Sequence, residues 1–258
     1  MLATLLAPFQ PTLSLDRTRR LAELAFAAGV ETRSDAATAR RLFATAGAGF
    51  DMHWHDGNRS ALLAVQRGRS HFLAGNLPMA VVAFRAGLRE TPYDLDLLRG
   101  LAECRAAIPY PTPMKPDERL RPDPPSGWRH RVSEWDVFRL AALSAALVVI
   151  GLARRFTARD GWAIPVAVLG GVGALVCLVV ALTLGAEASA EVERPTLVVT
   201  AEVYLRKGNG LSHQPRIDAT VPRGTELTER TRRGGWVQVE VAGGAVGWLP
   251  EGAVATVE

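Results

Sequence analysis

The chain has 258 residues, of which 48% are hydrophobic and 22% are charged, and its net charge is +4. That length accommodates two modest domains beside further segments. The excess arginines are scattered and do not gather on one face, so nucleic acid is excluded as a partner. Cys104 and Cys177 lie in different kinds of segment, so they predict neither a disulfide nor a metal site.

The first residues, MLATLLAPF, are apolar but do not form a clear signal peptide. They lack a basic region before the apolar run and a small-residue cleavage site after it. Three interpretations stay open: no signal is needed, the true start lies upstream, or the signal is degenerate.

Residues 1–108 predict an α-helical domain, because apolar residues recur at spacings of three and four. Within it, residues 61–94 (ALLAVQRGRSHFLAGNLPMAVVAFRAGLRETPYD) resemble a tetratricopeptide repeat, whose period is 34 residues. Small residues let the two antiparallel helices of a repeat approach, and an aromatic ring fills the space between them. The residues at these packing positions and at the closing proline are Gly68, Ala80, Phe84, Gly87 and Pro92.

A weaker copy of the repeat precedes this one, and residues 95–106 predict a capping helix after it. An insertion between the two copies contains His53, Trp54 and His55, which we interpret as a loop with two exposed histidines and a packed tryptophan. With His71 they do not complete a metal-ligand set, so no metal is expected. A short array of such repeats predicts a concave groove for partner proteins, and the alternative is a spacer or dimerisation surface.

Residues 109–134 predict a linker, because seven prolines fall within residues 109–130 and apolar periodicity is nearly lost. Proline fixes φ and removes a backbone donor, so an extended, semi-rigid tether is expected. A proline-rich ligand motif is the alternative.

Residues 135–186 predict a transmembrane helical hairpin with helices at about 135–153 and 162–184. Trp162–Leu184 contains 23 residues without a charge, and such a helix covers a hydrocarbon core of about 30 Å. Leu140–Ala153 is shorter than a span usually needs, so a single span plus a buried or interfacial helix stays open. The residues expected as anchors at the membrane interface are Trp135, Trp162, Arg154 and Arg155.

The basic residues around the hairpin predict its orientation. The turn at residues 154–161 has three arginines, whereas the exit at residues 187–196, a second linker, has one. The positive-inside rule therefore places the turn in the cytoplasm of a bacterial inner membrane. Both soluble domains then lie on the periplasmic or outer face.

Residues 197–258 change to a period of two, with glycine-rich turns, and predict five or six strands in a small all-β barrel. The pieces VYLRKGNG, VPRGTELTE and GGWVQVEVAGGAVGWL resemble a bacterial SH3 (SH3b) domain. Tyr204, Trp236 and Trp248 are candidates for its ligand groove, and the alternative is that the tryptophans pack the barrel. The resemblance implies a peptidoglycan peptide as a possible ligand class.

The order of these parts resembles the BatE-like proteins of bacterial aerotolerance operons. That resemblance implies a scaffold or adaptor in an envelope-stress or oxidative-stress complex, with von Willebrand A-domain membrane proteins and a MoxR-type ATPase as partners. A cell-wall-binding or wall-sensing protein is the alternative. No catalytic residues are expected, because Ser212-His213 has no third member and no nucleophile–base pair is evident. We therefore expect neither enzyme activity nor a cofactor.

Overall fold

The structure is a computed structural model that describes residues 10–92, 94–122, 134–157, 161–193 and 196–257. The chain divides into two compact units. Residues 1–123 and 195–258 together form the first, which we call the helix–sheet unit. Residues 124–194 form the second, which we call the apolar hairpin.

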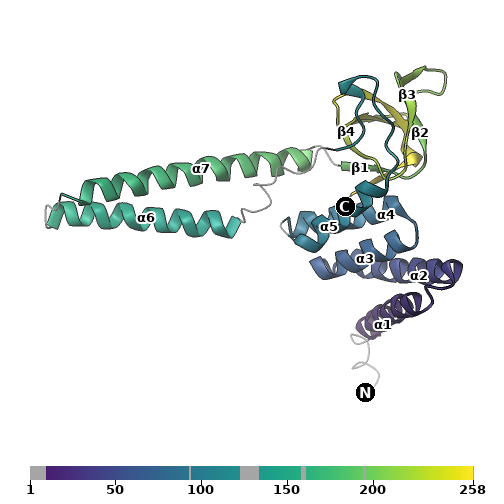
Figure 1. The fold of residues 1–258 in the computed structure, drawn as a ribbon, viewed down its shortest axis with the longest axis horizontal. Coiled ribbons are helices and arrows are strands. Elements are labelled where there is room, and N and C mark those ends of the chain that lie inside the picture. The colour runs from purple at the N-terminus through teal and green to yellow at the C-terminus, as the bar shows by residue number, and fades with distance from the viewer. Residues whose placement is uncertain (1–9, 93, 123–133, 158–160, 194–195, 258) are drawn as a thin grey trace, which may run out of the picture. The chain divides into compact units, whose positions relative to one another are not determined.

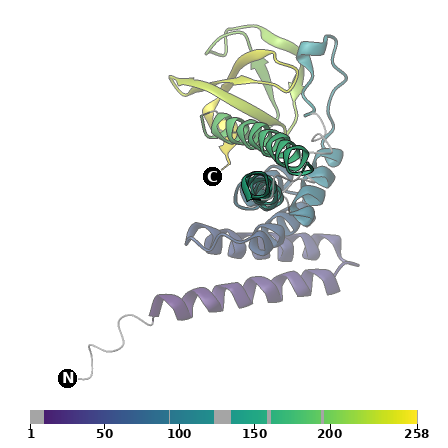
Figure 2. The same cartoon turned by 90° about the vertical axis from the view of Figure 1, so that its left-hand side faces the viewer.

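Five helices open the helix–sheet unit, and each packs against the next one along the chain (Figure 1). Asp35, Ser60 and Asp94 begin three of them, because their side chains accept hydrogen bonds from backbone N–H groups of the first turn. Figure 2 shows α1 and α2 side by side at one end of this stack. The helices are α1 (Gln10–Glu31), α2 (Ala36–His55), α3 (Ala61–Leu73), α4 (Leu77–Glu90) and α5 (Leu95–Ala107).

The C-terminal part of the unit is one antiparallel sheet of seven strands, in the order β3-β2-β6-β5-β4-β1-β7. Five or six strands are expected from the sequence, and the structure has seven; the short first and last strands, β1 and β7, pair with each other. The strands are β1 (Thr196–Val199), β2 (Val203–Arg206), β3 (Pro215–Val221), β4 (Glu226–Arg233), β5 (Trp236–Glu240), β6 (Val246–Pro250) and β7 (Val254–Thr256). Buried and less buried residues alternate along β5 and β6, so one face of the sheet encloses an apolar core.

The helices and the sheet share a core, although sequence analysis treats them as separate domains. Val198 of β1 and Val257 after β7 are buried in the apolar cluster of the helices. The turn at Gly224, where φ is +88°, lies against Ile108 and Leu77. Because these contacts join segments more than a hundred residues apart, the unit is built from both ends of the chain.

Residues 109–122, expected as part of a tether, pack along the sheet. Leu120 is 2% exposed and lies in the core of the sheet. The N–H groups of Gly243 and Ala245 donate to the carbonyl oxygens of Arg119 and Asp117, at 2.8 and 2.9 Å. A short 3-10 helix, Pro116–Glu118, lies in this stretch. The rest of the expected linker, up to residue 133, lies outside the described residues.

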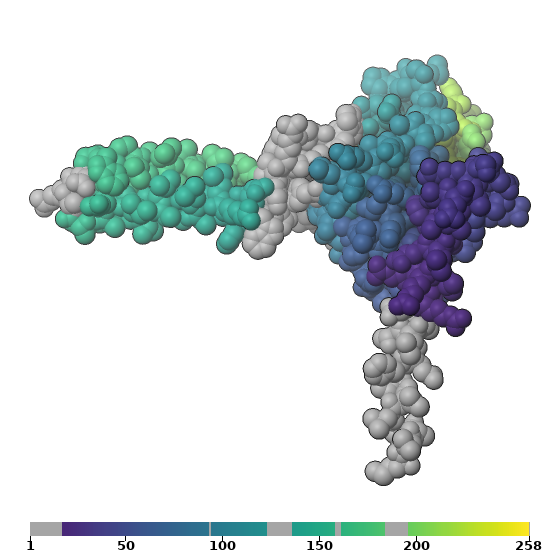
Figure 3. Space-filling view, turned by 60° about the horizontal axis from the view of Figure 1, so that its bottom comes forward, coloured from purple at the N-terminus to yellow at the C-terminus, as the bar shows by residue number. Residues whose placement is uncertain are grey.

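The apolar hairpin contains α6 (Glu134–Thr157) and α7 (Ala163–Glu193), which contact each other along their length (Figure 3). Both helices are long and apolar enough to cross a membrane. A Cβ on Gly170 would lie 2.6 Å from the Ser144 carbonyl oxygen, so the small residue permits a close backbone approach. Helix α7 continues beyond its expected end near residue 184, because the sequence EASAEVE is rich in the helix formers Ala and Glu.

Candidate functional site

The aromatic residues expected to form a ligand groove lie on three neighbouring strands of the sheet. Tyr204 on β2 is exposed, and Trp236 on β5 and Trp248 on β6 are half-buried. Trp248 pairs with Arg206 of β2, and Trp236 pairs with Pro250 of β6. Tyr204 precedes Arg206 by two residues on β2, and Pro250 follows Trp248 by two residues on β6. Because side chains alternate along a strand, Tyr204, Trp248, Pro250 and Trp236 share the outer face of the sheet, which we call the aromatic face.

The residues expected to carry the repeat packing meet mostly between α3, α4 and α5. Phe84 is 1% exposed, and a Cβ on Gly68 would lie 2.5 Å from its ring. Ala80 is fully buried, and a Cβ on Gly87 would collide with side chains of α3 and α5. Pro92 is exposed in the turn after α4. The four buried positions hold the helices together, so they do not supply a ligand surface.

The expected interface residues lie at the two ends of α6 and just before α7. Trp135 belongs to the first turn of α6, and Arg154 and Arg155 belong to its last turn. Trp162 is 46% exposed, and the guanidinium carbon of Arg154 lies 5.9 Å from the centre of its ring. Aromatic and basic side chains of this kind suit the boundary between hydrocarbon and water.

The insertion expected as a loop is the last turn of α2. His53 and Trp54 are 5% and 2% exposed, and His55 is exposed. The expectation of two exposed histidines is therefore wrong for His53. The physical reason is that the apolar spacing of three and four that starts at Phe43 continues through Phe50 to this turn.

A buried ion cluster lies beside this turn, and sequence analysis did not predict it. The Asp51 carboxylate accepts a hydrogen bond from Arg67 Nε at 2.8 Å, and His71 Nε2 lies 2.9 Å from its second oxygen. Burial alone would raise the pKa of Asp51, but the hydrogen bonds and charges of His71 and Arg67 outweigh it and lower that pKa. Arg67 also stacks on Trp54, with its guanidinium carbon 5.0 Å from the ring centre.

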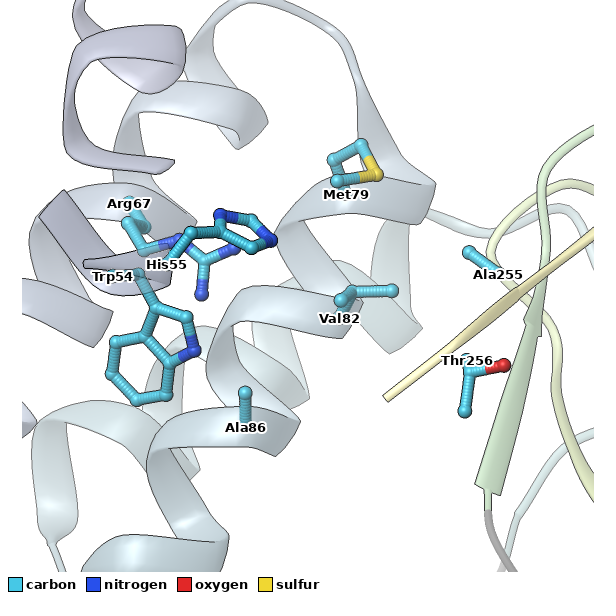
Figure 4. A pocket seen from close by; sticks show the side chains of 8 residues that line it. All are labelled: Trp54, His55, Arg67, Met79, Val82, Ala86, Ala255 and Thr256. Carbon is cyan, nitrogen blue, oxygen red and sulfur yellow. The ribbon is translucent and has the colours of Figure 1, made fainter. Parts of the chain in front are cut away.

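A pocket of about 270 Å³ opens next to the ion cluster, and we call it the seam pocket. As Figure 4 shows, α2 and α3 form one wall of the pocket, α4 forms a second wall, and β7 of the sheet forms a third. The residues that line the seam pocket are Trp54, His55, Arg67, Met79, Val82, Ala86, Ala255 and Thr256.

A second buried ion cluster joins the helices to the sheet. Glu226, the first residue of β4, has a side chain that is 3% exposed and forms ion pairs with Arg85 of α4 and Arg105 of α5. The Arg105 pair measures 2.6 Å between Nη2 and Oε2. Burial and then the nearby charge of Glu226 raise the pKa of Tyr110. The cluster therefore connects β4 of the sheet to α4 and α5.

The described residues contain no group of three or more His, Cys, Asp or Glu side chains arranged to hold a metal ion. Cys104 is fully buried, and burial raises the pKa of its thiol to about 12, so it stays protonated near neutral pH.

Comparisons of the chain with protein-family models, with curated proteins and with solved structures returned no match. Function is therefore inferred from the surfaces and contacts of this chain.

Proposed function

We propose that the protein is a membrane-anchored scaffold. The apolar hairpin anchors it, and the helix–sheet unit binds partner proteins and an envelope ligand. In the apolar stretch of each candidate span, only 11% is buried inside the protein. Such exposure fits helices that are covered by lipid rather than by a protein core. The repeat-like helices and the aromatic face provide binding surfaces, and neither carries evident catalytic groups.

The shared core of the helix–sheet unit is the observation that carries this proposal. The unit combines residues before 123 with residues after 195, and the apolar hairpin lies between them in the chain. A single membrane crossing would put the two halves of the core on opposite sides of the bilayer. The shared core therefore supports two crossings, with both soluble parts on one side.

The charges at the hairpin support a bacterial inner-membrane location with the helix–sheet unit on the periplasmic or outer face. Three arginines lie at residues 154–161, against one at residues 187–196, so the turn is assigned to the cytoplasm. The resemblance to BatE-like proteins supports von Willebrand A-domain membrane proteins and a MoxR-type ATPase system as partners.

Reporter fusions test the topology. A reporter that is active only outside the cytoplasm is fused after residue 258, inserted near residue 125 and inserted at residues 158–160. We expect activity at the first two positions and none at the third. Activity at residue 258 together with silence near residue 125 would contradict two crossings and the proposed scaffold.

A second candidate function is cell-wall binding or sensing through the aromatic face. The observation that favours it is that three aromatic side chains, Tyr204, Trp236 and Trp248, share one face of neighbouring strands. In a sedimentation assay with peptidoglycan, the full chain in detergent should co-sediment, and Trp248→Ala should weaken binding. Leu24→Ala is the control, because Leu24 is exposed on α1 and lies outside this face. Equal sedimentation of the Trp248→Ala variant would remove this candidate.

A further inference from the structure

We propose that the seam pocket is a binding site for a short aliphatic carboxylate. The ligand group is about the size of one amino-acid residue, and its source is either the free C-terminal residue of a peptide or a small free acid. This inference goes beyond the scaffold function, because it uses neither the membrane anchor nor the aromatic face.

Two buried donors in the wall of the pocket require an acceptor. Trp54 and Arg67 are 2% and 3% exposed, and neither the indole Nε1 nor the guanidinium Nη1 has a hydrogen-bond partner among the described residues. The two groups are stacked neighbours, 5.0 Å from guanidinium carbon to ring centre. A buried donor without an acceptor costs roughly 1–3 kcal/mol. A ligand oxygen that reached either donor would remove its penalty.

The guanidinium of Arg67 suits a carboxylate better than a neutral acceptor. Its Nε and Nη2 both lie 2.8 Å from one oxygen of Asp51, so the Nη1 edge remains for a second planar anion. Arg59 adds charge from outside, because its guanidinium carbon lies 5.9 Å from the indole ring. The contact of Arg59 with Glu90 is long, at 3.5 Å, and half-exposed.

The opposite wall is apolar and close. Met79, Val82 and Ala86 extend along one face of α4, and Ala255 faces them from β7 (Figure 4). A volume of about 270 Å³ lies below the roughly 300–1,000 Å³ of drug-sized sites, yet it far exceeds the ~30 Å³ that one water occupies. The pocket therefore fits a short aliphatic chain attached to the carboxylate.

The proposal is tested on the full chain in detergent micelles, labelled with ¹⁵N so that each indole N–H gives a separate NMR signal. The probes are N-acetyl-alanine, its uncharged amide, butyrate, and alanine-rich pentapeptides with a free or an amidated C-terminus. We expect the signal of Trp54, assigned by its loss in Trp54→Phe, to shift with the free carboxylates and not with the amides. Binding of butyrate as tight as that of the peptide indicates a small acid, and tighter binding of the free peptide indicates a peptide terminus.

Variants separate a ligand site from a structural cluster, with affinity measured by calorimetry. Trp54→Phe should weaken carboxylate binding about tenfold, which corresponds to about 1.4 kcal/mol, through loss of one donor. Trp236→Phe, a matched change on the aromatic face, should leave it unchanged. Ala255→Leu fills the pocket from the sheet without touching the ion cluster and should abolish binding. An unmoved Trp54 signal with every carboxylate, equal shifts with the amides, or unchanged affinity in Ala255→Leu would each overturn the proposal.

Discussion

Replacing Glu226 by Gln tests whether the buried ion cluster holds the sheet on the helices. The substitution keeps the shape of the side chain but removes the charge that faces Arg85 and Arg105. Removing one partner of a buried ion pair typically costs about 3–5 kcal/mol. The side chains of Arg85 and Arg105 are 26% and 14% exposed, so water hydrates part of their charge. We therefore expect a loss near the lower limit, about 3 kcal/mol in the free energy of unfolding.

The measurement is denaturant unfolding of the full chain in detergent, followed by tryptophan fluorescence. The midpoint should fall while the dependence on denaturant concentration stays the same. Glu240→Gln is the matched control, because Glu240 pairs with Arg230 at a site where both side chains are 27–40% exposed. Such a surface pair contributes about 0–1 kcal/mol. If Glu226→Gln costs no more than Glu240→Gln, the cluster does not hold the two parts together.

Two further substitutions and one labelling experiment test other contacts of the helix–sheet unit. Gly68→Ala should lower the free energy of unfolding by about 1–3 kcal/mol, because the added Cβ would meet the Phe84 ring. Gly252→Ala is the control and should be nearly neutral in the same assay, because a Cβ there would have no atom within 4 Å. The folded pKa of Asp51 lies below its ordinary value of 3.8, so its stabilisation is complete above about pH 4 and is lost as pH falls through the folded pKa. In Asp51→Asn the melting temperature should therefore fall less steeply as the pH is lowered below about 4. An unchanged fall would contradict the stabilising role of the Asp51 carboxylate. Cys104, with its pKa raised to about 12, should resist iodoacetamide at pH 8 until the chain unfolds, as mass spectrometry would show, and rapid labelling of the folded protein would refute its burial.

Patterns that repeat within a short stretch could be predicted from the sequence. The charge-free run at residues 162–184 indicated an apolar helix, and the structure has two helices long and apolar enough to cross a membrane. The small–large–small spacing of Ala80, Phe84 and Gly87 indicated a tight helix contact. Gly100 was missed, although a Cβ there would overlap the same Phe84 ring, because it belongs to the next helix and shares no local pattern with the others.

Contacts between distant segments could not be predicted. Glu226 follows a turn in a strand pattern, and nothing near it in the sequence indicates that arginines 121 and 141 positions earlier are its partners. Leu120 was the one apolar residue of a charged, proline-rich stretch from Lys115 to Asp123, and that isolation was a clue to its burial in the sheet. The donors of the seam pocket had no sequence pattern, because they become neighbours only when α2 packs on α3.

The division of the helix–sheet unit between the two ends of the chain has a consequence for biosynthesis. The ribosome completes α4 and α5 before it reaches the apolar hairpin, but Val198, Glu226 and Val257 are made last. Until then Val198 and Val257 are missing from the apolar cluster of the helices, and Glu226 has not yet formed its ion pairs with Arg85 and Arg105. The core of the helix–sheet unit is therefore completed only after the last residues of the chain emerge. A chain that ended before β1 would leave the apolar residues that pack against Val198 and Val257 exposed to water.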